Sequence, residues 1–306
     1  MVVLKFMVFA TISCRFLWSL NTSRDDFELM DYTKLISEEH FAVGHPVVIV
    51  LPHGEQGSGN NAVFYLIKNL CAAVRWPIFV FNARYEMEAN VFIETHKHGS
   101  YIILLSGPCQ DWEEHISGFR QQLSILRFGN TWESWNPRAK FLVSVMSDCP
   151  HFYTTLISRA ILNEFWSHGV VKALVLFKKS SEGRGKKSDQ NTSHSTQDTH
   201  MEIQTWFPYK NSQRCDPAEG TVPVKVFTIR NFSYIRGNDI FKGHFIKNLH
   251  GCPIRVHVRI YQPFVNPPKR FWLNDSYYYD SYEDGLEIEL LRIIGKSLNA
   301  SLVIVD

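Results

Sequence analysis

The sequence predicts an α/β fold in which helices cover both faces of a layered, mostly parallel sheet. Between Pro46 and Lys178, short apolar runs rich in β-branched residues recur at intervals of about 30 residues. Stretches with helical spacing of apolar residues separate these runs, which is typical of strands buried on both faces and joined by helices. The 306 residues are 45% hydrophobic and 20% charged, and this balance favours a packed core over disorder.

Five strands are expected in this region, and three helices connect them. The strands cover residues 47–51, 77–81, 101–106, 141–146 and 170–177. The helices cover residues 60–75, 111–126 and 148–166, where apolar residues fall on one stripe. Pro150 lies in the first turn of the last helix, a position that tolerates proline well. The fold of residues 21–178 is therefore predicted as one α/β domain.

The rest of the chain is expected to hold a loop, a junction and a third region. Residues 179–200 are polar and rich in Gly and Ser, which indicates a flexible loop. Residues 201–252 contain further apolar runs and complete the first domain up to a junction. In residues 253–306 a strand (254–261), a helix (284–298) and a strand (301–305) form an incomplete βαβ unit, because the chain stops inside its last strand.

The N-terminus and the glycosylation signals favour an exported chain. Lys5 precedes an apolar stretch that ends at Cys14, a pattern typical of a signal peptide over residues 1–20. Arg15 interrupts this stretch, so a misplaced start or a buried segment is the alternative. The sequence contains no run of 18 or more apolar residues, so it predicts no transmembrane helix. Asn-x-Ser/Thr glycosylation signals occur at Asn21, Asn191, Asn231, Asn274 and Asn299.

Four cysteines are disulfide candidates in an exported chain. Cys109 and Cys149 each follow a predicted strand, and they come within bridging distance if these strands are neighbours. Cys215 and Cys252 bracket the junction, and a bridge between them would stabilise the fold by roughly 3–4 kcal/mol. The alternative is that these cysteines are buried thiols.

One pattern points to an enzyme. Gly57, Gly59 and Ala62 follow the first strand and open the first helix, and so match the G-x-G-x-x-A form of a dinucleotide-binding turn. That turn is normally paired with an acid at the end of the next strand, where this chain has Asn-Ala-Arg84. An exported or mis-started dinucleotide-binding enzyme with a Rossmann-like domain is therefore the alternative function.

Other classes of partner are not favoured. Thirty-two Lys and Arg against 30 Asp and Glu leave a net charge of +2, so no electrostatic feature predicts binding to nucleic acid. His96 and His98 form the tightest histidine pair, but no Cys or carboxylate lies nearby at ligand spacing. We therefore expect both histidines to be exposed to solvent and the chain to bind no metal.

The C-terminal third resembles the insect chemosensory ionotropic receptors, which are divergent relatives of the ionotropic glutamate receptors. The resemblance is carried by residues 205–209 (Thr-Trp-Phe-Pro-Tyr), Cys215, 248–256 (Asn-Leu-His-Gly-Cys-Pro-Ile-Arg-Val), 261–264 (Tyr-Gln-Pro-Phe) and 283–299. It implies that residues 253–306 are a truncated S1 ligand-binding lobe. The upstream α/β domain is compatible with the family's amino-terminal domain, which has a periplasmic-binding-protein-like fold.

The resemblance also implies a function. Members of the family are ligand-gated cation channels in the plasma membrane of sensory neurons. They form hetero-multimers with co-receptor subunits and respond to small polar odorants or tastants. It implies no enzymatic activity and no cofactor. Phe264 matches an aromatic position near the ligand cleft, while the pore and the second half of the ligand site would lie beyond Asp306. We therefore expect this chain alone neither to conduct ions nor to bind an agonist well.

Overall fold

The computed structural model describes most of the chain after residue 23. The described residues are 24–52, 60–81, 97–128, 133–179, 200–206, 225–229, 235, 239–241, 248–272 and 278–305. They divide into two compact units. The first unit contains the described residues up to Trp206 and those from 225 to 241, and the second contains those from 248 to 305.

The first unit is built on a seven-stranded sheet in the order β2-β1-β3-β4-β5-β6-β7. The strands are β1 (Val47–Val50), β2 (Ile78–Phe81), β3 (Ser100–Leu105), β4 (Lys140–Cys149), β5 (Ala173–Lys179), β6 (His200–Thr205) and β7 (Lys225–Ile229). Strands β1 to β5 pair in parallel, whereas β6 pairs antiparallel with both β5 and β7. The prediction of an α/β fold with a mostly parallel sheet is confirmed.

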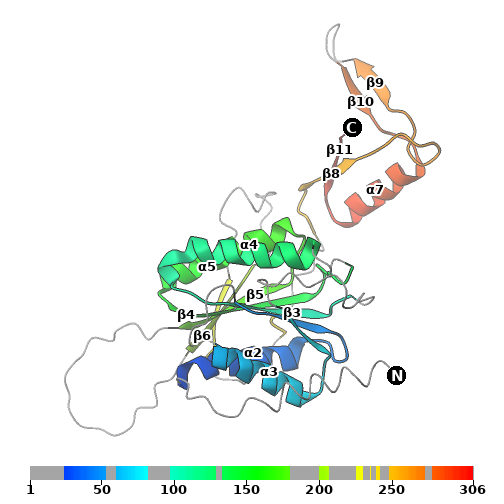
Figure 1. Ribbon diagram of the computed structural model, residues 1–306. Helices are drawn as coiled ribbons and strands as arrows, with labels where there is room; N and C mark the ends of the chain where they lie inside the picture. The colour runs from blue at the N-terminus through cyan, green and yellow to red at the C-terminus, as the bar shows by residue number, and fades with distance from the viewer. Residues whose placement is uncertain are drawn as a thin grey trace, which may run out of the picture. The chain divides into compact units, whose positions relative to one another are not determined.

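Helices cover both faces of this sheet (Figure 1). On one face lie α2 (Arg24–His40) and α3 (Asn60–Ala73), and on the other lie α4 (Trp112–Phe128) and α5 (His151–Ser167). Alternate strand residues point to opposite faces. Ile49, Ile102 and Leu174 therefore join the core against α2 and α3. On the other face, Phe141 packs against Phe165 of α5 with their ring centroids 5.1 Å apart.

Helix α2 was not predicted, because its buried stripe is partly polar. Thr33 and Ser37 are completely buried, and each hydroxyl donates to a carbonyl one turn earlier in the helix. The Thr33 hydroxyl also lies 2.8 Å from the hydroxyl of Ser144 on β4. Hydrogen bonding offsets the cost of burying such groups. A search for apolar periodicity alone does not detect a helix whose buried face includes polar residues.

His98 corrects a second expectation. The sequence predicted an exposed side chain, but His98 is buried just before β3. Its Nδ1 atom lies 2.9 Å from the hydroxyl of Tyr101, and its ring packs edge-on against the Tyr101 ring. Its carbonyl accepts a hydrogen bond from the side chain of Asn136. His98 therefore joins the segment before β3 to the segment before β4. His96 lies outside the described residues.

His40, the last residue of α2, predicts an acid-sensitive fold. Burial, and then the nearby charge of Lys140, lower the pKa of His40 below 6.5, against weaker opposing effects of Asp239 and Glu39. The unfolded chain then binds a proton more readily than the folded chain, so stability falls as the pH drops through about 6.5. Urea unfolding at pH 7.5, 6.5 and 5.5 should show this loss, and His40→Gln should reduce it. An equal loss in the variant would contradict the assignment.

The second unit contains a βαβ element and a hairpin. Strands β8 (Pro253–His257) and β11 (Ser301–Val305) pair in parallel, and α7 (Leu286–Ser297) lies between them in the chain. The βαβ order agrees with the sequence analysis, but β8 ends four residues earlier than expected. The antiparallel pair β9 (Lys269–Trp272) and β10 (Tyr278–Ser281) was not predicted. Val265, Tyr282 and Ile288 form the small core of this unit.

Candidate functional site

Phe264, the predicted ligand-cleft residue, lies on a tight turn beside the start of α7. The turn runs from Tyr261 to Val265, where the Tyr261 amide donates to the Val265 carbonyl over 3.0 Å. The side chain of Phe264 is 40% exposed, and its ring stacks on that of Tyr261 with centroids 5.7 Å apart. An exposed, stacked aromatic pair offers an apolar surface to a small ligand.

The same turn caps α7. The amide of Leu286 donates to the carbonyl of Pro263 over 3.3 Å, and the amide of Glu287 donates to that of Phe264 over 2.9 Å. The first amides of a helix are the groups that would otherwise attract an anion. Because these two already have backbone partners, they are not available to a ligand carboxylate.

Gly285 allows the turn and the helix to approach so closely. Its φ angle is +130°, and a Cβ atom at this position would lie 2.3 Å from the Phe264 carbonyl oxygen. No side chain fits that space, and L-residues rarely adopt this backbone conformation. The glycine of the Asp-Gly-Leu stretch that carries the family resemblance therefore determines where Phe264 lies.

Gly285→Ala should open the contact between the turn and α7. We expect hydrogen exchange of the α7 amides to accelerate by at least about tenfold, because strain of roughly 1–3 kcal/mol adds to the collision. Gly251→Ala is the matched control in the same unit, since Gly251 also has a positive φ (+85°) but no atom lies within 4 Å of its added Cβ. Equal acceleration in both variants would contradict a specific role for the approach to Phe264.

A second candidate site lies at the carboxyl end of the first unit's sheet. Helix α3 follows β1 on one face and α4 follows β3 on the other, although β1 and β3 are neighbours. In open α/β sheets, ligands usually bind at the strand ends beside such a switch point. Of the loops at this edge, residues 53–59 and 82–96 lie outside the described residues.

Two buried side chains of α4 form hydrogen bonds to backbone carbonyls at this edge. The Gln122 amide nitrogen donates to the Leu51 carbonyl over 2.6 Å, and His115 Nε2 lies 3.0 Å from the Pro108 carbonyl. Since a carbonyl only accepts, Nε2 carries a hydrogen and donates it to Pro108. Among the described residues, His115 Nδ1 and the Gln122 carbonyl oxygen have no hydrogen-bond partner. The edge thus contains two buried polar atoms that have no hydrogen-bond partner among the described residues.

A disulfide joins Cys109 and Cys149 at the same edge, with their Cα atoms 5.6 Å apart. Cys109 begins a short 3-10 helix, η1 (Cys109–Asp111), directly before α4, and Cys149 ends β4. Strand β4 is longer than predicted and has an irregular register between Val145 and Cys149. Cys252 is also disulfide-bonded. Its predicted partner Cys215 lies outside the described residues, so that pairing stays a prediction.

Of the three residues in the dinucleotide-binding pattern, the structure describes only Ala62. Gly57 and Gly59 lie outside the described residues. Ala62 is buried in the first turn of α3, within the core between α3 and the sheet. Close helix-to-strand packing is the role of the third small residue in that motif. A small residue at this position serves the same packing in any helix that starts beside a strand.

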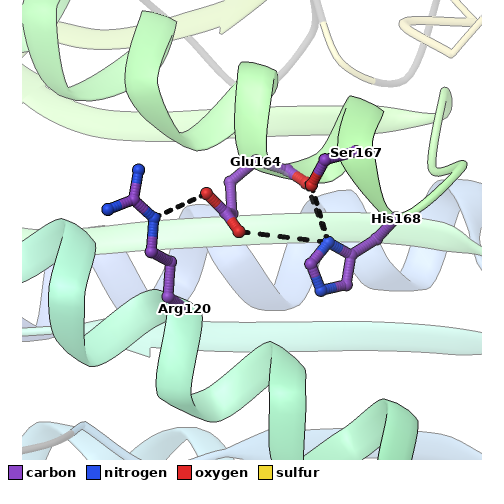
Figure 2. A network of polar contacts seen from close by, with 4 residues as sticks. All are labelled: Arg120, Glu164, Ser167 and His168. Carbon is purple, nitrogen blue, oxygen red and sulfur yellow. Dashed lines mark hydrogen bonds and ion pairs between the residues drawn. The ribbon is translucent and has the colours of Figure 1, made fainter.

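One polar cluster has the residue types of a catalytic triad but not its geometry (Figure 2). The Ser167 hydroxyl and the Glu164 carboxylate approach the same His168 atom, Nδ1, at 2.9 and 4.0 Å. In a triad, the nucleophile and the acid lie on opposite ring nitrogens. The Ser167 hydroxyl also bonds the Glu164 carbonyl at 2.8 Å, and Arg120 of α4 pairs with the Glu164 carboxylate at 2.7 Å. The cluster therefore closes the end of α5 and joins it to α4.

The remaining predicted sites are placed as follows. Asn299 is exposed in a left-handed turn after α7, and its side-chain nitrogen donates to Asn248 over 3.0 Å. The other glycosylation candidates lie outside the described residues, namely Asn21, Asn191, Asn231 and Asn274. Within the described ranges, no three His, Cys, Asp or Glu side chains gather as metal ligands. No described helix has both the length and the apolar content needed to cross a membrane.

Comparison with known proteins adds no family to these observations. No protein-family model matches the chain, and no curated protein matches it. A functional assignment therefore rests on the residues themselves.

Proposed function

We propose that this chain is the extracellular amino-terminal part of a chemosensory ionotropic receptor subunit, a ligand-gated cation channel that detects small polar odorants or tastants. The observation that carries the proposal is the arrangement around Gly285. The segments that resemble the receptor family, 248–256, 261–264 and 283–299, form β8, the Phe264 turn and α7 of one compact unit. A Cβ at Gly285 would collide with the Phe264 carbonyl, so the approach of the turn to α7 requires the glycine that the resemblance includes.

The first unit supports the same proposal. An α/β domain with a parallel sheet covered on both faces is the architecture expected of a periplasmic-binding-protein-like amino-terminal domain. A disulfide is more typical of exported than of cytosolic proteins. Co-receptor subunits of the same family are the proposed partners, at the extracellular side of the plasma membrane of sensory neurons.

The proposal limits what this chain does alone. Phe264 offers an aromatic surface, but the first two amides of α7 are already bonded to the turn. These two amides cannot hold the polar groups of an agonist, and we propose that receptor segments beyond this chain hold them. Cells that express only these residues should show no ligand-dependent current, because no described helix can cross a membrane and line a pore.

The decisive experiment is to sequence the transcript downstream of the codon for Asp306 and to locate it in tissue. Three hydrophobic spans, a second ligand-binding segment and expression in sensory neurons would support the receptor. A stop codon at this point in every transcript, together with expression outside sensory tissue, would overturn it.

A dinucleotide-binding enzyme is the second candidate, and the strand order favours keeping it. The order β2-β1-β3-β4-β5 places the start of α3 at a switch point, where nucleotides bind in comparable sheets. Calorimetric titration of the secreted chain with NAD and NADP separates the two functions. Micromolar or tighter binding that is lost in Gly59→Val would support the enzyme and count against the receptor, and no heat of binding would remove the enzyme.

A further inference from the structure

Helix α7 is apolar on two opposite sides. Ile288 and Gly295 are buried on its inner side, where Gly295 lies against Leu302 of β11. On the other side, Leu286, Leu290 and Ile293 are 63%, 55% and 65% exposed, and we call these three residues the outer stripe. A helix that is apolar on both sides is normally covered on both sides. The outer stripe therefore predicts a partner.

The spacing of the outer stripe suits another helix. Leu286, Leu290 and Ile293 are separated by four and then three residues, which is the d-a-d spacing of a heptad. Ser297 follows at the next a position. Twelve residues are too few for an isolated coiled coil, but α7 is already formed and packed on its own unit. A second helix can therefore bind without the cost of folding this one.

The charges beside the stripe indicate which helix binds and in which direction. In this register, Glu289 and Lys296 both occupy g positions, one heptad apart on the same flank, and both are exposed. In an antiparallel pair of identical helices, the g positions of the two copies face each other. Glu289 of each copy then lies beside Lys296 of the other, so this flank of the helix is complementary to itself.

We propose that the outer stripe of α7 binds the same stripe of a second copy of this chain, with the two helices antiparallel. The arrangement is two-fold symmetric, as in most homodimers. Arg292 pairs with Glu289 within each copy and keeps that carboxylate positioned on this flank. The proposal does not depend on the receptor assignment, because it concerns an exposed face of the chain itself.

Sedimentation of the secreted chain between about 1 and 100 μM tests the surface. The wild type should form a concentration-dependent dimer, and Leu290→Glu should raise its dissociation constant at least about tenfold, since two charges would be buried per dimer. Phe152→Glu is the matched control, because Phe152 is also largely exposed but lies on α5 of the first unit. It should leave the dimer unchanged.

Charge reversal tests the direction. Lys296→Glu should weaken the dimer about threefold or more, and the double variant Glu289→Lys with Lys296→Glu should restore it. A parallel dimer would not respond to Lys296→Glu, so an unchanged dissociation constant would overturn the antiparallel arrangement.

A monomer at 100 μM, or a dimer that Leu290→Glu leaves intact, would overturn the proposal. Circular dichroism of each variant at equal concentration shows whether the fold is retained, and Leu290→Ser provides a milder change on the same surface.

Discussion

Replacement of Cys109 and Cys149 by serine should lower the free energy of unfolding of the first unit by about 4 kcal/mol, because a loop that spans 40 residues is released in the unfolded chain. The bridge ties η1, directly before α4, to the end of β4. We therefore expect the first turn of α4 to exchange its amide hydrogens faster as well. Urea unfolding followed by tryptophan fluorescence measures the total loss.

Cys71→Ser is the matched control for this prediction. Cys71 lies half-buried on α3 and takes no part in the Cys109–Cys149 bridge. Its replacement should change stability by less than about 1 kcal/mol. A similar loss in the control and in the double variant would show that the effect comes from altered packing and not from the bridge.

Phe141→Ala should lower the free energy of unfolding of the first unit by about 3–5 kcal/mol, since it removes a large side chain from a fully packed site. The Phe141 ring is completely buried and stacks on Tyr101 with centroids 4.4 Å apart. The rings of Trp135 and Phe165 also contact it, at 5.5 and 5.1 Å. Its loss leaves a cavity between β3, β4 and α5 that these rigid rings fill poorly.

Two further variants test whether the loss of stability comes from the volume removed at this buried site. Phe141→Leu keeps much of the apolar volume and should lose less than half as much stability. Phe152→Ala removes an exposed phenylalanine from α5 and should change stability by less than about 0.5 kcal/mol. If Phe141→Ala were no worse than Phe152→Ala, the aromatic cluster would not be the core of that face.

Much of the first unit was predictable, because its strands are buried on both faces. Strands β1 and β3 read as continuous apolar runs, and that pattern identifies a central parallel strand without any knowledge of its neighbours. The positions of Cys109 and Cys149 after two such strands were visible for the same reason. The antiparallel pairing of β6 and β7 was not, since strand direction depends on connections that apolar patterns do not reveal.

The candidate sites were predictable only in outline. The Tyr-Gln-Pro-Phe stretch drew attention to Phe264, but no pattern showed that its carbonyl lies against Gly285 and caps α7. Likewise, Leu286 and Leu290 lie exposed on one face of α7, while the opposite face supplies the packing to β11. A helix with two apolar sides does not reveal from its sequence which side faces inward.

Local chemistry and spacing therefore determined the fold class, the central strands, the βαβ order and the cysteine pair at the sheet edge. Only the tertiary structure decided the buried polar face of α2, the burial of His98 and the partners of the α7 amides. In these cases the outcome depends on hydrogen bonds between distant segments, such as Thr33 with Ser144. A polar side chain is buried when a partner from elsewhere in the chain meets it, and the sequence around it does not contain that partner.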